Sequence, residues 1–308
     1  QPLHQAGLSC LMLACGPSTT KCKHPSIRPP SSMVQDSNNS DPAGLPLAGQ
    51  RAVVTGASGG IGSAIALGLA REGADVLLHT HQNRSEADRI AEQIEQLGRQ
   101  ATVLSADIGD PDQRAELVEQ AWQWQQGIDT WINAAGADVL TGEAADLSFE
   151  EKLQRLWRVD VQGTMLLCRM VGQRMLAASK EPGEAVLLNI GWDQVAHGME
   201  GESGEMFGAI KGAVTAFTLS LARSLAPTVR VNCIAPGWIR TAWGEQASGA
   251  WQQRAISESL LGRWGTPQDV ANVACFLASG AASFLSGQVI PVNGGFRHAG
   301  SGPGEPGS

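Results

Sequence analysis

The stretch Thr55-Gly56-Ala57-Ser58-Gly59-Gly60-Ile61-Gly62 follows a short apolar run and opens an amphipathic one. Gly56 permits a sharp turn, Gly60 lets backbone approach a phosphate, and Gly62 lets the following helix pack closely on the strand. The free N–H groups and the dipole at the start of that helix favour a bound anion. The stretch therefore predicts a pyrophosphate site of a dinucleotide, with Ser58 and Ile61 among its contacts.

The same alternation of short apolar and longer amphipathic runs continues along the chain. Strands are expected at 51–55, 75–79, 101–105, 130–133, 185–190, 229–234 and 288–292. Helices are expected at 61–71, 85–97, 111–124, 149–178 and 204–225. This rhythm predicts an α/β fold, a doubly wound seven-stranded parallel sheet of the Rossmann type in a single domain. Ligands of such sheets bind beyond the carboxyl ends of the strands, where the strand order reverses.

Composition sets the domain limits and the classes of partner. Residues 1–46 are rich in Pro, Ser, Thr and Asn, which predicts a disordered extension. We expect the domain to comprise residues 47–298 and a flexible tail to comprise residues 299–308. The net charge of −8 disfavours nucleic acid, and no apolar run approaches the ~20 residues of a membrane span. The six cysteines lack zinc-binding spacing, so we expect no metal, reduced thiols and a cytoplasmic protein.

Two alternatives concern the N-terminal segment. Met12-Leu13-Ala14-Cys15 loosely resembles a lipoprotein cleavage site, but no basic residue precedes the short apolar run before it. Translation from Met33 is the other alternative, and the first 32 residues would then not belong to the protein.

Further motifs follow the predicted strands in a fixed order. They are Asp107 after the third, Asn133-Ala134-Ala135-Gly136 after the fourth, Pro236-Gly237 after the sixth, and Asn293-Gly294-Gly295 after the seventh. With the T-G-x-x-x-G-x-G stretch, they resemble the short-chain dehydrogenase/reductase family, in particular its 3-oxoacyl-carrier-protein reductase-like branch, over roughly 47–296.

The resemblance implies an oxidoreductase that transfers a hydride to or from a carbonyl or a conjugated alkene. It places Asp107 and Ile108 at the adenine, Asn133, Ala134 and Gly136 along the cofactor, and Pro236, Gly237 and Thr241 at the nicotinamide side. Relatives assemble through helices that correspond to 161–178 and 206–225, so a homo-oligomer, a tetramer or a dimer, is expected.

The residues after the second strand bear on the choice of nucleotide. An NAD site usually has an acid at the end of this strand, where the chain reads Leu78-His79-Thr80-His81. Arg84 follows, so NADP(H) is preferred. NAD(H) stays possible because Gly59 stands where many NADP-using relatives have a basic residue, and Arg84 alternatively belongs to a solvated helix start.

The chain contains no tyrosine, although the resemblance implies a catalytic set of Tyr, Lys, Ser and Asn. Lys211 matches the lysine, which holds the nicotinamide ribose. Phe207, Trp192 and Asp160 stand at the other three positions. Beside Lys211, Asp160 would form an ion pair that keeps the lysine charged; the alternative is a helix residue that faces elsewhere.

A proton donor must then come from another group. Asp193 is the first choice, because burial near Trp192 and Phe207 would raise its pKa until it holds a proton. Glu202, Glu205 and His197 lie on the same loop and are alternatives. Reduction of a conjugated alkene, protonated by water or a carboxylic acid, is a further possibility.

Two hypotheses in which the protein is not a catalyst stay open as well. A nucleotide-binding protein, a sensor or an inactive subunit, would keep the phosphate loop and Lys211 while losing the other catalytic groups. A structural subunit that binds no nucleotide fits less well, because Gly56, Gly60 and Gly62 are intact.

The segment 238–266 corresponds to the part of the family that closes over substrate. It contains four of the nine tryptophans, Trp238, Trp243, Trp251 and Trp264. With Trp192 and Phe207 they predict a flat apolar pocket and a small apolar or aromatic substrate. The alternative is that these rings pack on their own domain or on a neighbouring subunit.

Overall fold

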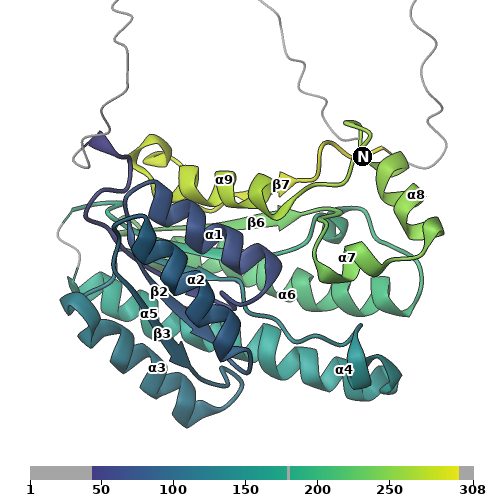
Figure 1. Cartoon of the computed structure of the whole chain (residues 1–308), viewed down its shortest axis with the longest axis horizontal. Coiled ribbons are helices and arrows are strands. Elements are labelled where there is room, and N and C mark those ends of the chain that lie inside the picture. The colour runs from purple at the N-terminus through teal and green to yellow at the C-terminus, as the bar shows by residue number, and fades with distance from the viewer. Residues whose placement is uncertain (1–43, 179–180, 298–308) are drawn as a thin grey trace, which may run out of the picture. The chain divides into compact units, whose positions relative to one another are not determined.

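The computed structural model describes residues 44–178 and 181–297 (Figure 1). Ordered structure includes residues just before the expected domain start at 47, because the Ala48 N–H donates to the Leu45 carbonyl at 3.1 Å. The rest of the predicted N-terminal extension and the tail 299–308 lie outside the described residues. Within the described part of the chain, no helix is both long and apolar enough to cross a membrane.

All seven predicted strands are present in one parallel sheet with the order β3-β2-β1-β4-β5-β6-β7. The strands are β1 (Arg51–Thr55), β2 (Asp75–Thr80), β3 (Ala101–Ser105), β4 (Thr130–Asn133), β5 (Ala185–Ile190), β6 (Val229–Pro236) and β7 (Val289–Val292). The order reverses between β1 and β4, where Thr55 lies opposite Asn133. The predicted doubly wound fold is confirmed, and a ligand site is expected at this reversal.

Nine α-helices connect the described strands. They are α1 (Gly60–Arg71), α2 (Arg84–Gln96), α3 (Pro111–Gln123), α4 (Phe149–Leu156), α5 (Thr164–Ala178), α6 (Glu202–Leu225), α7 (Ala242–Gln246), α8 (Gly249–Glu258) and α9 (Pro267–Ala278). Short 3₁₀ turns are η2 (Trp124–Gln126), η3 (Gly142–Asp146), η5 (Asp193–Ala196) and η6 (Gly280–Ala282). Side chains fix several starts: Asp110 caps α3 ahead of Pro111, and Ser148 forms a capping box with Glu151 at α4.

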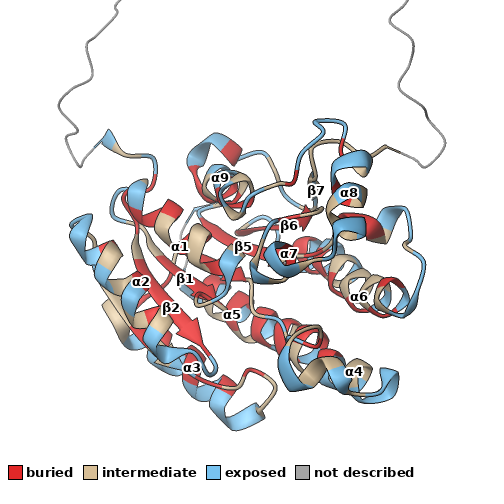
Figure 2. Ribbon diagram, turned by 45° about the vertical axis from the view of Figure 1, so that its right-hand side comes forward, coloured by how far each residue is buried: buried red, intermediate tan, exposed pale blue. Residues whose placement is uncertain are grey.

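Helices cover both faces of the sheet, as the apolar strand runs require. Alternate strand residues enter two cores: Val54 and Leu78 pack with α1, α2 and α9, whereas Val53 and Leu77 pack with α3, α5 and α6. Figure 1 shows α1 and α9 side by side on one face. Figure 2 shows buried central strands and exposed outer helix surfaces, whereas the edge strands β3 and β7 are only partly buried.

The helix predicted over 149–178 has the expected extent, but it is not one regular helix. A π-helical segment, η4 (Trp157–Gly163), separates α4 from α5. The wider turn changes the directions in which its side chains point, and such segments often occur at functional sites. Asp160 lies within this segment and is buried.

Arg230 on β6 is a buried charge that satisfies backbone carbonyls near the end of α9. Its guanidinium donates to the carbonyls of Leu277 at 2.8 Å, Ala282 at 3.1 Å and Ser279 at 3.3 Å. Burial lowers the pKa of Arg230. The Arg230 side chain therefore links β6 to the C-terminal end of α9.

We expect Arg230→Met to lower the free energy of unfolding by about 2–4 kcal/mol, because it leaves buried carbonyls without donors. Urea unfolding measures the change. The matched control is Arg89→Met on the exposed side of α2, where the loss of a surface pair with Glu86 should leave the free energy of unfolding nearly unchanged. Equal effects of the two variants would contradict this role of Arg230.

Candidate active site

The turn between β1 and α1 has no space for side chains at two of its glycines. Gly56 has a φ of +67°, and a Cβ there would lie 2.6 Å from the Cα of Ala135. A Cβ on Gly62 would overlap the carbonyl of Gly56. No side chain caps the start of α1, so its first N–H groups stay available to a ligand. This cradle fits a pyrophosphate.

His79 supports the same turn from below. Its Nε2 donates to the Ala106 carbonyl at 2.9 Å, and its Nδ1 accepts the Gly56 N–H at 3.4 Å. Burial lowers the pKa of His79 to about 4, so the ring is neutral at neutral pH. The imidazole thus links the ends of β1, β2 and β3 beneath the glycine turn.

A cavity of about 300 Å³ lies at the ends of β1, β2, β3 and β4. Six residues predicted to bind the cofactor line it: Gly56, Ser58, Asp107, Ile108, Ala134 and Gly136. The Asp107 carboxylate accepts from Arg158 and from the Gly109 N–H, both at 2.8 Å. Burial alone would raise the pKa of Asp107, but these two hydrogen bonds and the charges of Arg158 and His81 together lower it.

The side chains of Arg84 and Asn133, which were predicted to bind the cofactor, form contacts away from this cavity. Arg84 pairs with Asp88 at 2.9 Å on the exposed side of α2 and does not line this cavity. Asn133 stays inside the sheet, where its side chain donates to Asn189 at 2.9 Å and accepts from Trp131 at 2.9 Å.

The sequence interpretation missed several polar residues that do line this cavity. They are His81, Gln82 and Asn83 after β2, with Arg155 and Arg158 from the α4 side. His81, Gln82 and Asn83 directly follow the carboxyl end of β2, and this position alone could have predicted that they lie at the ligand-binding edge of the sheet. The two arginines are brought in by the α4–η4 packing, which no local pattern indicates.

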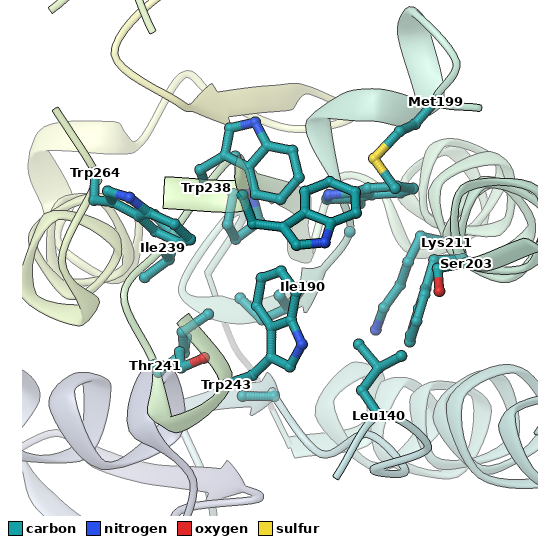
Figure 3. Close-up of a pocket in the computed structure, with 18 residues that line it drawn as sticks. Leu140, Ile190, Met199, Ser203, Lys211, Trp238, Ile239, Thr241, Trp243 and Trp264 are labelled. Carbon is teal, nitrogen blue, oxygen red and sulfur yellow. The ribbon is translucent and has the colours of Figure 1, made fainter. Parts of the chain in front are cut away.

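A second cavity, of about 490 Å³, lies at the ends of β5 and β6 (Figure 3). It shares Ala134 with the first cavity. The expected residues in its wall are Ile61, Ala134, Trp192, Phe207, Lys211, Pro236, Gly237, Thr241 and the four lid tryptophans. Thr241 lies directly beside Gly60, where a Cβ would be 3.3 Å from its methyl group.

The expected ion pair between Lys211 and Asp160 is present. Lys211 Nζ lies 3.0 Å from Asp160 Oδ2, and the Asp160 side chain is only 3% exposed. The other carboxylate oxygen accepts the Ala137 N–H at 2.8 Å. A Cβ on Gly136 would lie 2.9 Å from Oδ2, so the close approach of Asp160 needs a glycine there.

Aromatic rings occupy the places where the resemblance implies hydroxyls. The rings of Trp192 and Phe207 meet edge to face, with centroids 6.3 Å apart. Neither side chain has a group that can donate a proton to a substrate as a general acid. Among the residues that line this cavity, Lys211 is the one with a titratable side chain.

Asp193 lies outside the cavity wall. Its carboxylate accepts from Asn293 Nδ2 at 3.0 Å and packs against Gly237, and its other oxygen is buried without a partner in the described chain. Burial raises the pKa of Asp193, as expected. The position, however, does not favour Asp193 as a proton donor to substrate. Glu202, Glu205 and His197 are exposed and do not line the cavity either.

The four lid tryptophans form one cluster. Trp238 stacks on Trp243 with centroids 6.3 Å apart, and Trp251 lies 5.5 Å from Trp238. Arg254 lies over Trp251 at 5.2 Å and forms ion pairs with Glu200 and Glu258 at 2.6 and 2.7 Å. The arginine thus joins α8 to the loop before α6. Leu140, Met199 and Ser203 complete the wall and were not anticipated.

Comparison with known proteins agrees with this architecture. The family model described as Enoyl-(Acyl carrier protein) reductase matches residues 56–297. Cyclohexanol dehydrogenase of a Rhodococcus species is 35% identical over 274 residues, which cover 83% of this chain and 98% of the relative.

Two solved structures are also similar. A 7 alpha-hydroxysteroid dehydrogenase, complexed with NADH and 7-oxo glycochenodeoxycholic acid, has a TM-score of 0.73 and 30% identity, and the match covers 82% of this chain and 96% of that one. A short chain dehydrogenase from Burkholderia cenocepacia in complex with NADP has a TM-score of 0.71 and 28% identity, with 81% and 98% covered.

The chain therefore belongs to the short-chain dehydrogenase/reductase family, and it is an oxidoreductase of that type.

The buried His79 predicts a loss of stability in acid. Its pKa is about 4 in the folded protein against the ordinary value of 6.5 for an exposed imidazole, so the unfolded chain binds the proton more tightly. The stabilisation is complete above pH 6.5 and is lost as the pH falls through 4, by about 3 kcal/mol. Urea unfolding between pH 7 and 4 should show this loss in the wild type and in the exposed control His81→Gln. His79→Gln should lack it, and an equal slope in all three would refute the assignment.

Proposed function

We propose that the protein binds NADP(H), with NAD(H) as the weaker cofactor, and interconverts a carbonyl or a conjugated alkene with its reduced form on an apolar or aromatic substrate. The observation that carries this proposal is the pair of cavities that meet at Ala134. One has the glycine cradle, and the other has Lys211 and a wall of aromatic rings.

The cradle supports the cofactor assignment by its shape. Gly56 and Gly62 exclude side chains, and the uncapped start of α1 offers N–H groups to phosphate oxygens. Asp107 and Ile108 would lie along the adenosine portion, and Lys211 and Thr241 along the nicotinamide portion. When bound, a nicotinamide dinucleotide supplies or accepts the hydride.

The preference for NADP(H) rests on charge near the end of β2. This strand ends without an acid, and His81, Arg155 and Arg158 line the same cavity. Arg158 is already paired with Asp107. Basic groups favour the additional phosphate of NADP(H), whereas an acid would favour a free ribose hydroxyl.

We assign the proton to Lys211, in place of Asp193. An alkylammonium group and a phenol are acids of similar strength in water, and Lys211 alone among the lining residues has a titratable side chain. In carbonyl reduction an N–H bond of the ammonium breaks, an O–H bond forms on the substrate, and the amine regains a proton from solvent. Asp160 holds the ammonium in place at 3.0 Å. Asp193 then positions Gly237 and Asn293 and does not react.

A second candidate function is nucleotide binding without catalysis, as in a sensor or an inactive subunit. It is favoured by Trp192 and Phe207, which place hydrocarbon where the family has hydroxyls. Both functions require the cradle, so cofactor binding supports each of them and turnover separates them.

Calorimetric titration with NADPH and NADH, followed by turnover of cyclic ketones and conjugated enones, tests the proposal. We expect tighter binding of NADPH and measurable turnover. Lys211→Met should lower kcat by about 10²- to 10⁴-fold, because it removes the general acid. Phe207→Tyr should raise ketone turnover, because it restores a phenol four residues before Lys211.

The matched control is Lys152→Met, whose ammonium hydrogen-bonds the Ala145 carbonyl outside the cavity and should leave kcat unchanged. Binding without any turnover, also in Phe207→Tyr, would contradict the catalytic proposal and favour the second candidate. Failure of both nucleotides to bind would contradict both candidates.

We also propose a homo-oligomer that is assembled through α5 and α6. Leu166 and Leu176 on α5 are 41% and 39% exposed, and Leu219 on α6 is 39% exposed. Light scattering during size exclusion should give two or four times the chain mass of 32.3 kDa. Leu176→Lys with Leu219→Lys should reduce it to one chain, and a wild-type monomer would contradict the proposal.

A cytoplasmic location completes the proposal. Cys168, Cys233 and Cys275, the cysteines in the described part of the chain, are free thiols, as is usual in reducing compartments. Fractionation of the native cells tests this location, and recovery with exported proteins would contradict it.

A further inference from the structure

One face of α6 forms a wall of the second cavity. Ser203, Phe207 and Lys211 follow one another at intervals of four residues, so their side chains lie along one side of the helix. All three line the cavity. Figure 3 shows Ser203 and Lys211 on the same side, opposite Thr241 and Trp264.

The three positions differ in what they offer a substrate. Lys211 is paired with Asp160 and is the proposed proton donor. Phe207 is apolar. Ser203 is half-buried, and its hydroxyl forms no hydrogen bond with any residue that the structure describes. It is therefore a polar group in an aromatic wall that has no partner from the described chain.

Only one other hydroxyl side chain lines this cavity in the described chain, that of Thr241. Thr241 lies beside Gly60 of the glycine cradle, on the proposed cofactor side. The two hydroxyls thus belong to opposite ends of the cavity. Ser203 is the one that remains for the substrate.

We infer that Ser203 is a specificity-determining residue that binds an oxygen of the substrate remote from the reacting carbon. This inference rests on the proposed function. We place the reacting carbon beside Phe207, between Ser203 and Lys211, so that its oxygen faces the Lys211 ammonium. Four residues of helix rise by ~6 Å, so the second oxygen lies about that far from this carbon. The substrate class is a flat, apolar ketone or enone with a hydroxyl or carbonyl group across its ring system.

The energetic basis is the difference between a satisfied and an unsatisfied polar group. A hydroxyl confined in an aromatic wall loses contact with water when an apolar body fills the cavity. A substrate with a hydrogen-bonding group replaces the lost water, whereas a substrate without such a group leaves the hydroxyl unsatisfied. Ser203 therefore discriminates between two ketones of equal shape.

The test compares 1-tetralone with 6-hydroxy-1-tetralone, whose hydroxyl lies across the aromatic ring from the carbonyl carbon. Each ketone is titrated calorimetrically into protein saturated with NADP⁺, which cannot reduce it, and into protein without nucleotide. The wild type should bind the hydroxyketone about three- to ten-fold more tightly. Ser203→Ala should abolish this preference and leave the affinity for 1-tetralone unchanged or higher.

The matched control is Ser224→Ala, an exposed serine near the other end of α6 that bonds only the Ser220 carbonyl. It should keep the wild-type preference. A preference that persists in Ser203→Ala would overturn the inference, and so would a wild type that binds neither ketone.

The proposed function fails separately from this inference. If NADP⁺ does not bind, while the ketone preference exists and depends on Ser203, the cofactor proposal is refuted and the role of Ser203 is supported.

Discussion

The close approach of the first βα turn to the end of β4 is the steric constraint on which the site depends. A side chain at Gly56 would collide with Ala135, and one at Gly62 would collide with the Gly56 carbonyl. The turn can therefore lie flat against the sheet at the reversal of strand order. The start of α1, the neutral His79 beneath it and the shared wall residue Ala134 are all positioned by this contact.

The Lys211–Asp160 pair adds a charge constraint to this steric one. Removing two charges from water is costly, and only good geometry with further hydrogen bonds compensates the loss. Asp160 meets that condition through the Ala137 N–H, and η4 directs its side chain there. The pair leaves one cation facing an otherwise uncharged cavity, which confines any proton chemistry to that end.

The elements of the fold could be predicted from sequence because the central strands are buried on both faces and read as continuous apolar runs. The strand bounds differ from expectation by at most two residues, as at β6, which continues to Pro236. The π-helical segment gave no sequence signal, since its residues suit an ordinary helix. For the same reason, the sequence did not predict that Asp160 lies within a π-helical turn.

Side-chain positions were harder to predict than the elements that bear them. The aromatic residues Trp192 and Phe207 predicted the burial and raised pKa of Asp193, but the hydrogen bond from Asn293, 100 residues later in the chain, decides where the carboxylate points. The Arg84 guanidinium pairs with Asp88, its i,i+4 neighbour on the same helix, and therefore does not line the cavity. Ser203 was missed because helix α6 begins earlier than its sequence pattern indicates.

The aromatic wall also determines how the molecule absorbs and emits light. Five of the nine tryptophans line a single cavity, and the chain contains no tyrosine. Near-ultraviolet absorption therefore comes overwhelmingly from indole rings, and the stacked pair Trp238–Trp243 lies close enough for its excited states to interact. Intrinsic fluorescence and near-ultraviolet circular dichroism thus contain a large contribution from this one cavity, without any attached label.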